Sequence, residues 1–426
     1  MGQRVVKRIT SIAVGSFFLL GLAVGLRTIA ADSVKPPSQS AKTKISGQKP
    51  SPTANPRLVA ANLRFGFKLF SQLLRREQDG NVFISPSSVS LALAMTYNGA
   101  SGETKQAMAR TLEINGMGLP ELNRANADLK TLLENPDSSV RLEIANSLWA
   151  RRGIPFNSDF LQRNQTFYGA RVTDLDFQDP QAPATINNWV KQNTEGKISQ
   201  IIERLQSDDV LFLINAIYFK GAWTHQFDQR STIEKPFTLA NGQRKQHPMM
   251  VNRSQYRYYE TDRFQAVSLP YGNNRVSMYV FLPKPGSNLT EFYKTLTPEN
   301  WQRWIAQFRS QPGLVQIPRF KLEYGVELKD ALSALGMEVA FDPNRASFKE
   351  LSGIPTQIDQ VKHKTFVEVN EAGTEAAAAT SVGVVATSAP IGEPFTMTVD
   401  RPFFCAIRDN QTGTMLFMGS ITDPKL

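Results

Sequence analysis

The chain has 426 residues and a formal net charge of +10. Residues 1–57 hold nine Lys and Arg and one Asp, a net +8, which leaves +2 for residues 58–426. This nearly neutral body excludes recognition of RNA or DNA through bulk positive charge. Cys405 is the only cysteine, which excludes an intramolecular disulfide, so stability must come from the core.

The first 57 residues differ from the rest. Basic residues precede an apolar run at residues 9–26, and the small residues Ala30 and Ala31 follow it. This layout is typical of a secretory signal peptide over residues 1–31, although the run is also long enough for an uncleaved N-terminal membrane anchor. Residues 32–57 are rich in Pro, Ser and Lys, which predicts a flexible tether. We therefore expect an exported protein, secreted or periplasmic, that contacts a membrane only through this segment if it stays uncleaved.

Helix and strand patterns follow one another through residues 58–426 without a linker or an internal repeat. Helical spacing of apolar residues occurs at residues 58–74, 89–98, 119–133, 159–168 and 184–193. Strand patterns occur at residues 82–84, 140–149, 210–219, 265–269, 276–282, 313–322 and 366–370. A final pair, 403–408 and 415–421, flanks the turn residues 409–413 and predicts a hairpin. Helices come first and strands concentrate later, which predicts one large α+β domain.

The sequence shows no catalytic or metal-binding constellation. His225, His247 and His363 lie far apart without metal-ligand spacing, and we interpret each as a hydrogen-bonded structural residue. Cys405 lies in an apolar strand, where a buried structural thiol is expected. The glycine-rich phosphate and dinucleotide motifs and the serine-hydrolase elbow are also missing. We therefore expect no enzyme activity, no cofactor and no metal.

The stretch from Glu371 to Thr380 is unusual for a surface loop. It is made of small residues, and from Ala376 to Pro390 it carries no charged or aromatic residue. Because its side chains are small, such a segment could fit at almost any tightly packed position in a protein. Ala and Glu are strong helix formers, however, so local propensity alone predicts a helix or a linker here.

Several motifs, taken together and in order, resemble the serpin family. They are residues 81–88 (NVFISPSS), 98–104 (NGASGET), 215–223 (NAIYFKGAW), 248–250 (PMM), 269–271 (LPY), 281–283 (FLP), 318–320 (PRF), 401–403 (RPF) and 417–419 (FMG). The resemblance covers residues 58–426. It implies the serpin fold, a single large domain with three β-sheets, eight or nine helices and an exposed reactive loop at about 371–396. It also implies a monomer.

The resemblance assigns the hinge of that loop. The hinge residues are Glu371, Gly373, Thr374, Glu375, Ala376, Ala377, Ala378 and Ala379. Side chains alternate along a strand. If Thr374 faces the core after insertion, Glu375 faces solvent and the alanines that follow face the core in alternation.

Family spacing places the bond that the target protease attacks at Thr387–Ser388, with Ala386–Thr387 as the next choice. The neighbouring residues are small. They suit serine proteases with shallow primary pockets, elastase-like or subtilisin-like, and a cysteine protease is a further target class. Neither Arg nor Lys is present there to attract a trypsin-like enzyme.

The resemblance also implies that Ser85, Ser88, Asn215 and His363 form a polar cluster beneath the central sheet, where strands part during loop insertion. The competing interpretation is a set of ordinary buried polar residues that satisfy one another. Trp223 matches the residue at the end of the sheet that opens first. An ordinary core tryptophan is its alternative.

The implied function is suicide-substrate inhibition of serine proteases. A cut loop inserts into the central sheet and carries the acyl-linked protease with it. The alternative is a non-inhibitory serpin that acts as a carrier or chaperone. Such members tend to carry bulky, charged or proline residues in the hinge, and this chain does not. An exported enzyme is disfavoured because no catalytic constellation is present.

Overall fold

The computed structural model describes residues 52–77, 80–134, 136–206, 208–374 and 393–426. These residues belong to one unit, Ser51–Leu426, that separates by its contacts from Met1–Pro50. The expected signal segment, most of the expected tether and the alternative bonds around Thr387 lie outside the described residues.

The described residues form nine α-helices, several of them capped by side chains that the sequence supplies. They are α1 (Pro56–Leu74), α2 (Pro86–Tyr97), α3 (Gly102–Thr111), α4 (Leu119–Glu134), α5 (Ser158–Tyr168), α6 (Ala182–Gln192), α7 (Leu289–Thr295), α8 (Pro298–Gln307) and α9 (Lys329–Leu332). Asn55 caps α1 and Ser85 caps α2, each with a proline as the first helical residue. The predicted helix at 89–98 thus begins three residues earlier, because the Ser85 cap and Pro86 start the helix before its apolar run.

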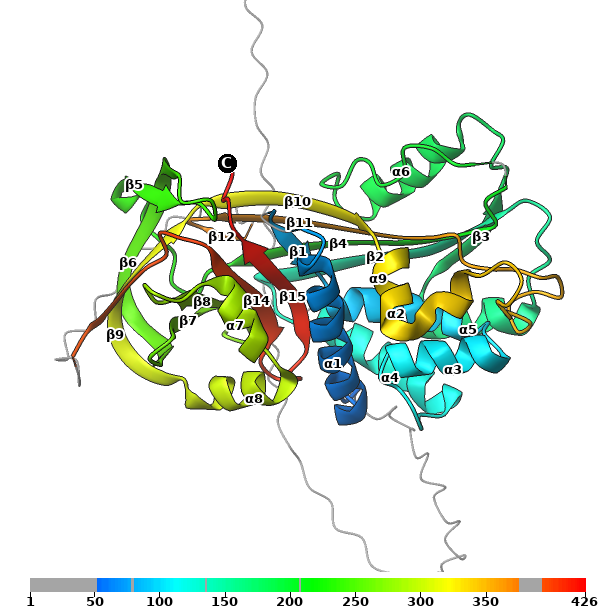
Figure 1. Ribbon diagram of the computed structural model, residues 1–426, viewed down its shortest axis with the longest axis horizontal. Helices are drawn as coiled ribbons and strands as arrows, with labels where there is room; N and C mark the ends of the chain where they lie inside the picture. Colours follow the sequence, from blue (N-terminus) through cyan, green and yellow to red (C-terminus); the bar gives the residue numbers. More distant parts are fainter. Residues whose placement is uncertain (1–51, 78–79, 135, 207, 375–392) are drawn as a thin grey trace, which may run out of the picture. The chain divides into compact units, whose positions relative to one another are not determined.

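The smaller sheet has six strands in the order β10-β11-β12-β4-β2-β3 (Figure 1). Their bounds are β2 (Val140–Arg151), β3 (Arg171–Leu175), β4 (Leu211–Ala222), β10 (Phe320–Glu327), β11 (Gln360–Asn370) and β12 (Gly373–Thr374). Nearly every residue of β4 is buried, because helices cover both faces of the sheet at its centre. Helix α2 packs on one face, and α6 covers the other over Trp149, Phe212 and Tyr218.

The larger sheet has nine strands. They are β1 (Val82–Ile84), β5 (Ile233–Thr238), β6 (Arg244–Glu260), β7 (Phe264–Tyr271), β8 (Val276–Pro283), β9 (Arg309–Pro318), β13 (Phe395–Thr398), β14 (Phe403–Asp409) and β15 (Met415–Ile421). The long strand β6 pairs with β5 at its start, with β9 along its middle and with β7 at its end. Strand β6 therefore joins one set of strands, β5, β9 and β13, to a second set, β7, β8, β14, β15 and β1. These two sets and the six-stranded sheet make up the three β-sheets expected of the fold.

One predicted strand is wrong in its bounds. Residues 313–322 are not a single strand, because β9 ends at Pro318 and β10 begins at Phe320 in the other sheet. Pro318 has no N–H to continue a ladder, and the N–H of Arg319 donates instead to the carbonyl of Pro248. The predicted hairpin at 403–421 is confirmed as β14 and β15.

Candidate functional site

Strands β11 and β4 pair along only part of their length. They run parallel and directly paired from Gln360 opposite Phe212 to Phe366 opposite Tyr218. Beyond Phe366 the two strands part, and the two-residue strand β12 lies between them. The central sheet therefore contains a gap that is open at one end and closed by a parallel ladder at the other.

Gly373 and Thr374 occupy the open end of this gap. Thr374 lies opposite Val369 of β11 on one side and Gly221 of β4 on the other, antiparallel to both. The φ of Gly373 is +152°, and a Cβ there would lie 2.1 Å from the carbonyl oxygen of Gly221. Only glycine suits this position, because the backbone of β4 passes too closely for any side chain.

Tyr271 contacts Thr374 directly, and Trp223 packs behind Tyr271. The hydroxyl oxygens of Thr374 and Tyr271 are 2.7 Å apart and share a hydrogen bond, and both residues are fully buried. Burial raises the pKa of Tyr271, so its hydroxyl keeps its proton. The ring of Trp223 stacks on that of Tyr271 at 4.3 Å, and its Nε1–H donates to the carbonyl of Asn370 at 2.9 Å. Trp223 thus lies at the open end of the gap.

The turn that leads into β12 is fixed by Asn370 and Glu371. The Asn370 side-chain oxygen accepts hydrogen bonds from the N–H groups of Ala372 and Gly373, which closes a tight turn. Glu371 is 3% exposed, and its carboxylate accepts a hydrogen bond from Thr232 at 2.6 Å and pairs with Arg319 at 3.4 Å. A carboxylate this buried requires such partners.

His363 lies within the ladder that closes the gap. The N–H of Ser85 donates to His363 Nε2 at 3.1 Å, so Nε2 carries no proton. The proton is therefore on Nδ1, which donates to the side-chain oxygen of Asn215, 2.5 Å away on β4. His363 and Asn215 are register partners, so this hydrogen bond fastens β11 to β4 side chain to side chain.

Asn215 extends the network to α2 and β2. Its amide nitrogen donates to Ser88 Oγ and to the side-chain oxygen of Asn146, each at 2.5 Å. Asn146 is its register partner on β2. These polar groups lie in the core and satisfy one another, as buried polar groups must.

The structure brings together the four residues predicted beneath the sheet and places Trp223 beside Gly373 and Thr374. Their roles in insertion stay predictions. Glu371 lies where the strands part. Glu375, Ala376, Ala377, Ala378 and Ala379, and the bonds at Ala386, Thr387 and Ser388, lie outside the described residues.

Sequence analysis missed four residues of this site, Asn146, Tyr271, Arg319 and Thr232. Asn146 could have been noticed, since it is a polar residue in the middle of an apolar strand. Tyr271 and Arg319 lie in the motifs at 269–271 and 318–320, but their contacts, like that of Thr232, join residues more than 50 positions apart and leave no local signal.

Two further observations concern metal ligands and membrane spans among the described residues. In the described part of the chain, no group of His, Cys, Asp and Glu side chains is arranged to hold a metal ion. Likewise, none of the helices within those ranges is long and apolar enough to span a membrane.

The His363 network predicts a loss of stability in acid. Burial lowers the pKa of His363 to about 3, against about 6.5 for a free histidine. At pH values between these two pKa values, His363 is protonated in the unfolded chain but stays neutral in the folded protein. The contribution of His363 to the free energy of unfolding should therefore be fully present above pH 6.5. As the pH drops below 6.5, that free energy should decrease by about 1.4 kcal/mol per pH unit from this group. Urea unfolding from pH 7 to pH 4.5 should show a shallower decline for His363→Gln than for the parent; equal declines would contradict this.

Comparisons with known proteins agree on one family. A family model described as Serpin (serine protease inhibitor) matches residues 60–424. Human leukocyte elastase inhibitor is 35% identical over 380 residues, which cover 86% of this chain and 99% of that protein. Human antithrombin-III is 33% identical over 383 residues, covering 86% and 82%. The crystal structure of tengpin, a thermophilic serpin in the native state, matches with a TM-score of 0.81 and 33% identity over 87% of this chain and 95% of that one. This chain therefore belongs to the serpin family of serine protease inhibitors.

Proposed function

We propose that the protein is a suicide-substrate inhibitor of serine proteases, whose cut loop enters the gap between β4 and β11. The observation that carries this proposal is the position of Gly373 and Thr374. They already pair with both strands at the open end, within the reactive loop that the resemblance implies at about 371–396. A chain that continues in this register would become a new central strand.

The proposed reaction begins as ordinary proteolysis. The protease serine attacks the carbonyl carbon of Thr387, the Thr387–Ser388 bond breaks, and the amine of Ser388 leaves with the proton supplied by the protease's own base. The protease is then held as an ester on Thr387. Insertion of the freed segment drags the protease along the sheet, and distortion of its active site stops the hydrolysis of that ester.

Backbone pairing supplies the driving force. About fifteen inserted residues gain ladder hydrogen bonds at roughly 0.5–1.5 kcal/mol each, on the order of 10 kcal/mol in all. Against this, the parallel ladder from Gln360 to Phe366 must be broken, together with the His363–Asn215 hydrogen bond. The exchange is favourable because one parallel pairing is replaced by two antiparallel ones.

The first residues to enter control the competition between insertion and ester hydrolysis. Thr374 enters without carrying a charge, and its hydroxyl finds Tyr271 as a partner. The residues that follow are small and need no desolvation of charge once Glu375 faces solvent. This hinge therefore favours inhibition over the carrier or chaperone alternative.

Target class and location rest on the sequence. The small residues before Ser388 suit elastase-like or subtilisin-like proteases, in line with the similarity to human leukocyte elastase inhibitor. We propose that residues 1–31 direct export as a signal peptide or remain as an anchor. Residues 32–57 would then act as a tether up to α1, which begins at Pro56, and the inhibitor would work as a monomer.

The proposed mechanism predicts a covalent complex between the inhibitor and its protease. Mixing residues 51–426 with pancreatic elastase or subtilisin should yield a band on denaturing gels at the summed mass of inhibitor and protease, since an ester bond survives SDS. The control uses protease whose active-site serine is blocked beforehand. Cleavage of the loop with protease activity untouched would contradict the inhibitory function and favour the carrier alternative.

The proposed mechanism also predicts that a charge at position 374 impairs inhibition. Thr374→Arg places a charge at a fully buried position and should slow insertion, because the guanidinium must be desolvated. As 1.4 kcal/mol corresponds to a tenfold change, the number of inhibitor molecules consumed per protease should rise at least about tenfold. Thr374→Ser keeps the hydroxyl and should inhibit like the parent. Titration of residual protease activity measures both, and unchanged inhibition by Thr374→Arg would remove Thr374 from the hinge.

A further inference from the structure

A groove lies beside the β7–β8 turn, and none of its lining residues is among those described at the gap in the central sheet. It has a volume of about 250 Å³ and is lined by residues of β6, β7, β8 and β9, by His225 and by Asn410 after β14. Pockets for drug-sized ligands usually measure about 300–1,000 Å³, so this groove suits a smaller molecule. The sequence analysis and the serpin mechanism leave it without a role.

Register brings a guanidinium and two hydroxyls to one face of the sheet. Arg257 of β6 lies opposite Ser268 of β7, and Pro270, two residues further along β7, lies opposite Ser277 of β8. Residues two apart on a strand share a face. Arg257 is exposed, whereas Ser268 and Ser277 are 4% and 2% exposed, so the hydroxyls form the floor and the guanidinium the rim.

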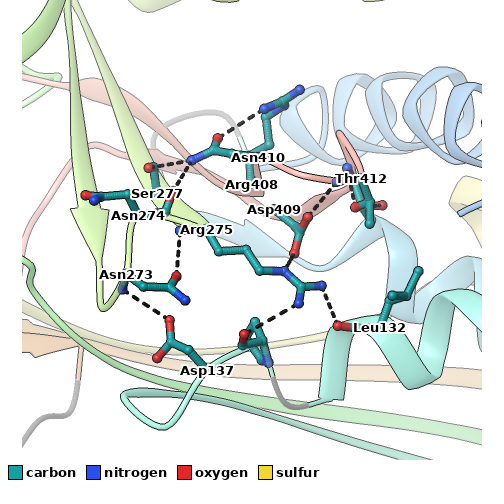
Figure 2. A network of polar contacts seen from close by, with 12 residues as sticks. Leu132, Asp137, Asn273, Asn274, Arg275, Ser277, Arg408, Asp409, Asn410 and Thr412 are labelled. Atoms are coloured by element: carbon teal, nitrogen blue, oxygen red, sulfur yellow. Dashed lines mark hydrogen bonds and ion pairs between the residues drawn. The ribbon is translucent and has the colours of Figure 1, made fainter. Parts of the chain in front are cut away.

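The Ser277 hydroxyl is oriented by Asn410, as Figure 2 shows. The side-chain oxygen of Asn410 accepts hydrogen bonds from Tyr279 at 2.8 Å and Arg408 at 3.0 Å, which fixes which end of the amide is nitrogen. That nitrogen donates to Ser277 Oγ at 2.8 Å and to the carbonyl of Asn274 at 3.0 Å. Because Ser277 Oγ already accepts a proton, its own hydroxyl proton is left to donate into the groove.

The groove has donors but no carboxylate. None of its lining residues is Asp or Glu. The neighbouring Asp409 is fully buried and occupied, since its carboxylate pairs with Arg275 at 2.8 Å and accepts a hydrogen bond from the N–H of Thr412 at 2.7 Å (Figure 2). Within the described part of the chain, Arg257 makes no ion pair with an acidic residue. Its charge therefore remains available to a ligand.

We propose that this groove binds a small tetrahedral oxyanion, a phosphate or sulfate group. Arginine on the rim supplies a charged fork for two oxygens, and the Ser268 and Ser277 hydroxyls donate from the floor to others. Donors that come from three strands and different directions suit the several oxygens of a tetrahedral group better than the two coplanar oxygens of a carboxylate. Binding would also link β6, β7 and β8 beside the turn that follows Tyr271.

The test is isothermal calorimetry on residues 51–426 at constant ionic strength. Inorganic phosphate and inorganic sulfate should each bind saturably in the millimolar range or tighter, and acetate more weakly. Glucose 6-phosphate shows whether the natural ligand is a free ion or a phosphate group on a larger molecule. Tighter binding than that of inorganic phosphate indicates the larger molecule, and weaker binding indicates the free ion. Both outcomes support the site.

Variants separate the groove from general surface charge. Arg257→Gln should weaken phosphate binding at least tenfold without a change in melting temperature in phosphate-free buffer, and Ser277→Ala should weaken phosphate binding several-fold. The matched control is Arg253→Gln, an exposed arginine on the same strand that does not line the groove, which should bind within twofold of the parent. Absence of saturable binding, acetate binding as tightly as phosphate, or an equal loss in Arg253→Gln would each overturn the proposal.

Discussion

The hydrogen bond from His363 to Asn215 joins β11 to β4 at the centre of their directly paired segment, and the proposed insertion requires that this bond break. Seven residue pairs make up that segment, and His363 is in the fourth. While these pairs hold, the gap beyond Phe366 takes only Gly373 and Thr374. In the proposed insertion these pairs would separate to admit an additional strand, and the polar partners of Asn215 would have to be rearranged or replaced.

The open end of the gap is held by contacts of a different kind. Tyr271 and Trp223 come from two different sheet systems and meet on Thr374 and Asn370. Glu371 is fixed by Arg319, which lies at the crossing point between β9 and β10. Gly373 and Thr374 are thus held in register between β4 and β11 by contacts on both sides, and the proposed insertion would continue from them.

Much of the fold and part of the site could be predicted from the sequence. The resemblance placed Ser85 and Ser88 in a polar cluster, and the structure shows that Ser85 also caps α2; the two features coincide because the capping serine donates its N–H to His363. The contacts of Tyr271 and Arg319 could not be predicted, because they depend on how two sheets pack. Strand β6 was also missed. Its exposed polar residues and Pro248 interrupt the alternation that marks a strand, and only its neighbours on both sides make it one.

The most direct measurement of the central claim is the melting temperature of the protein after its loop has been cut by a protease that is then removed. If the cut segment inserts between β4 and β11, a gain on the order of 10 kcal/mol should raise the melting temperature by roughly 15 °C or more above that of the intact protein. An unchanged or lower melting temperature would mean that the segment stays outside the sheet, and the proposed mechanism would be wrong.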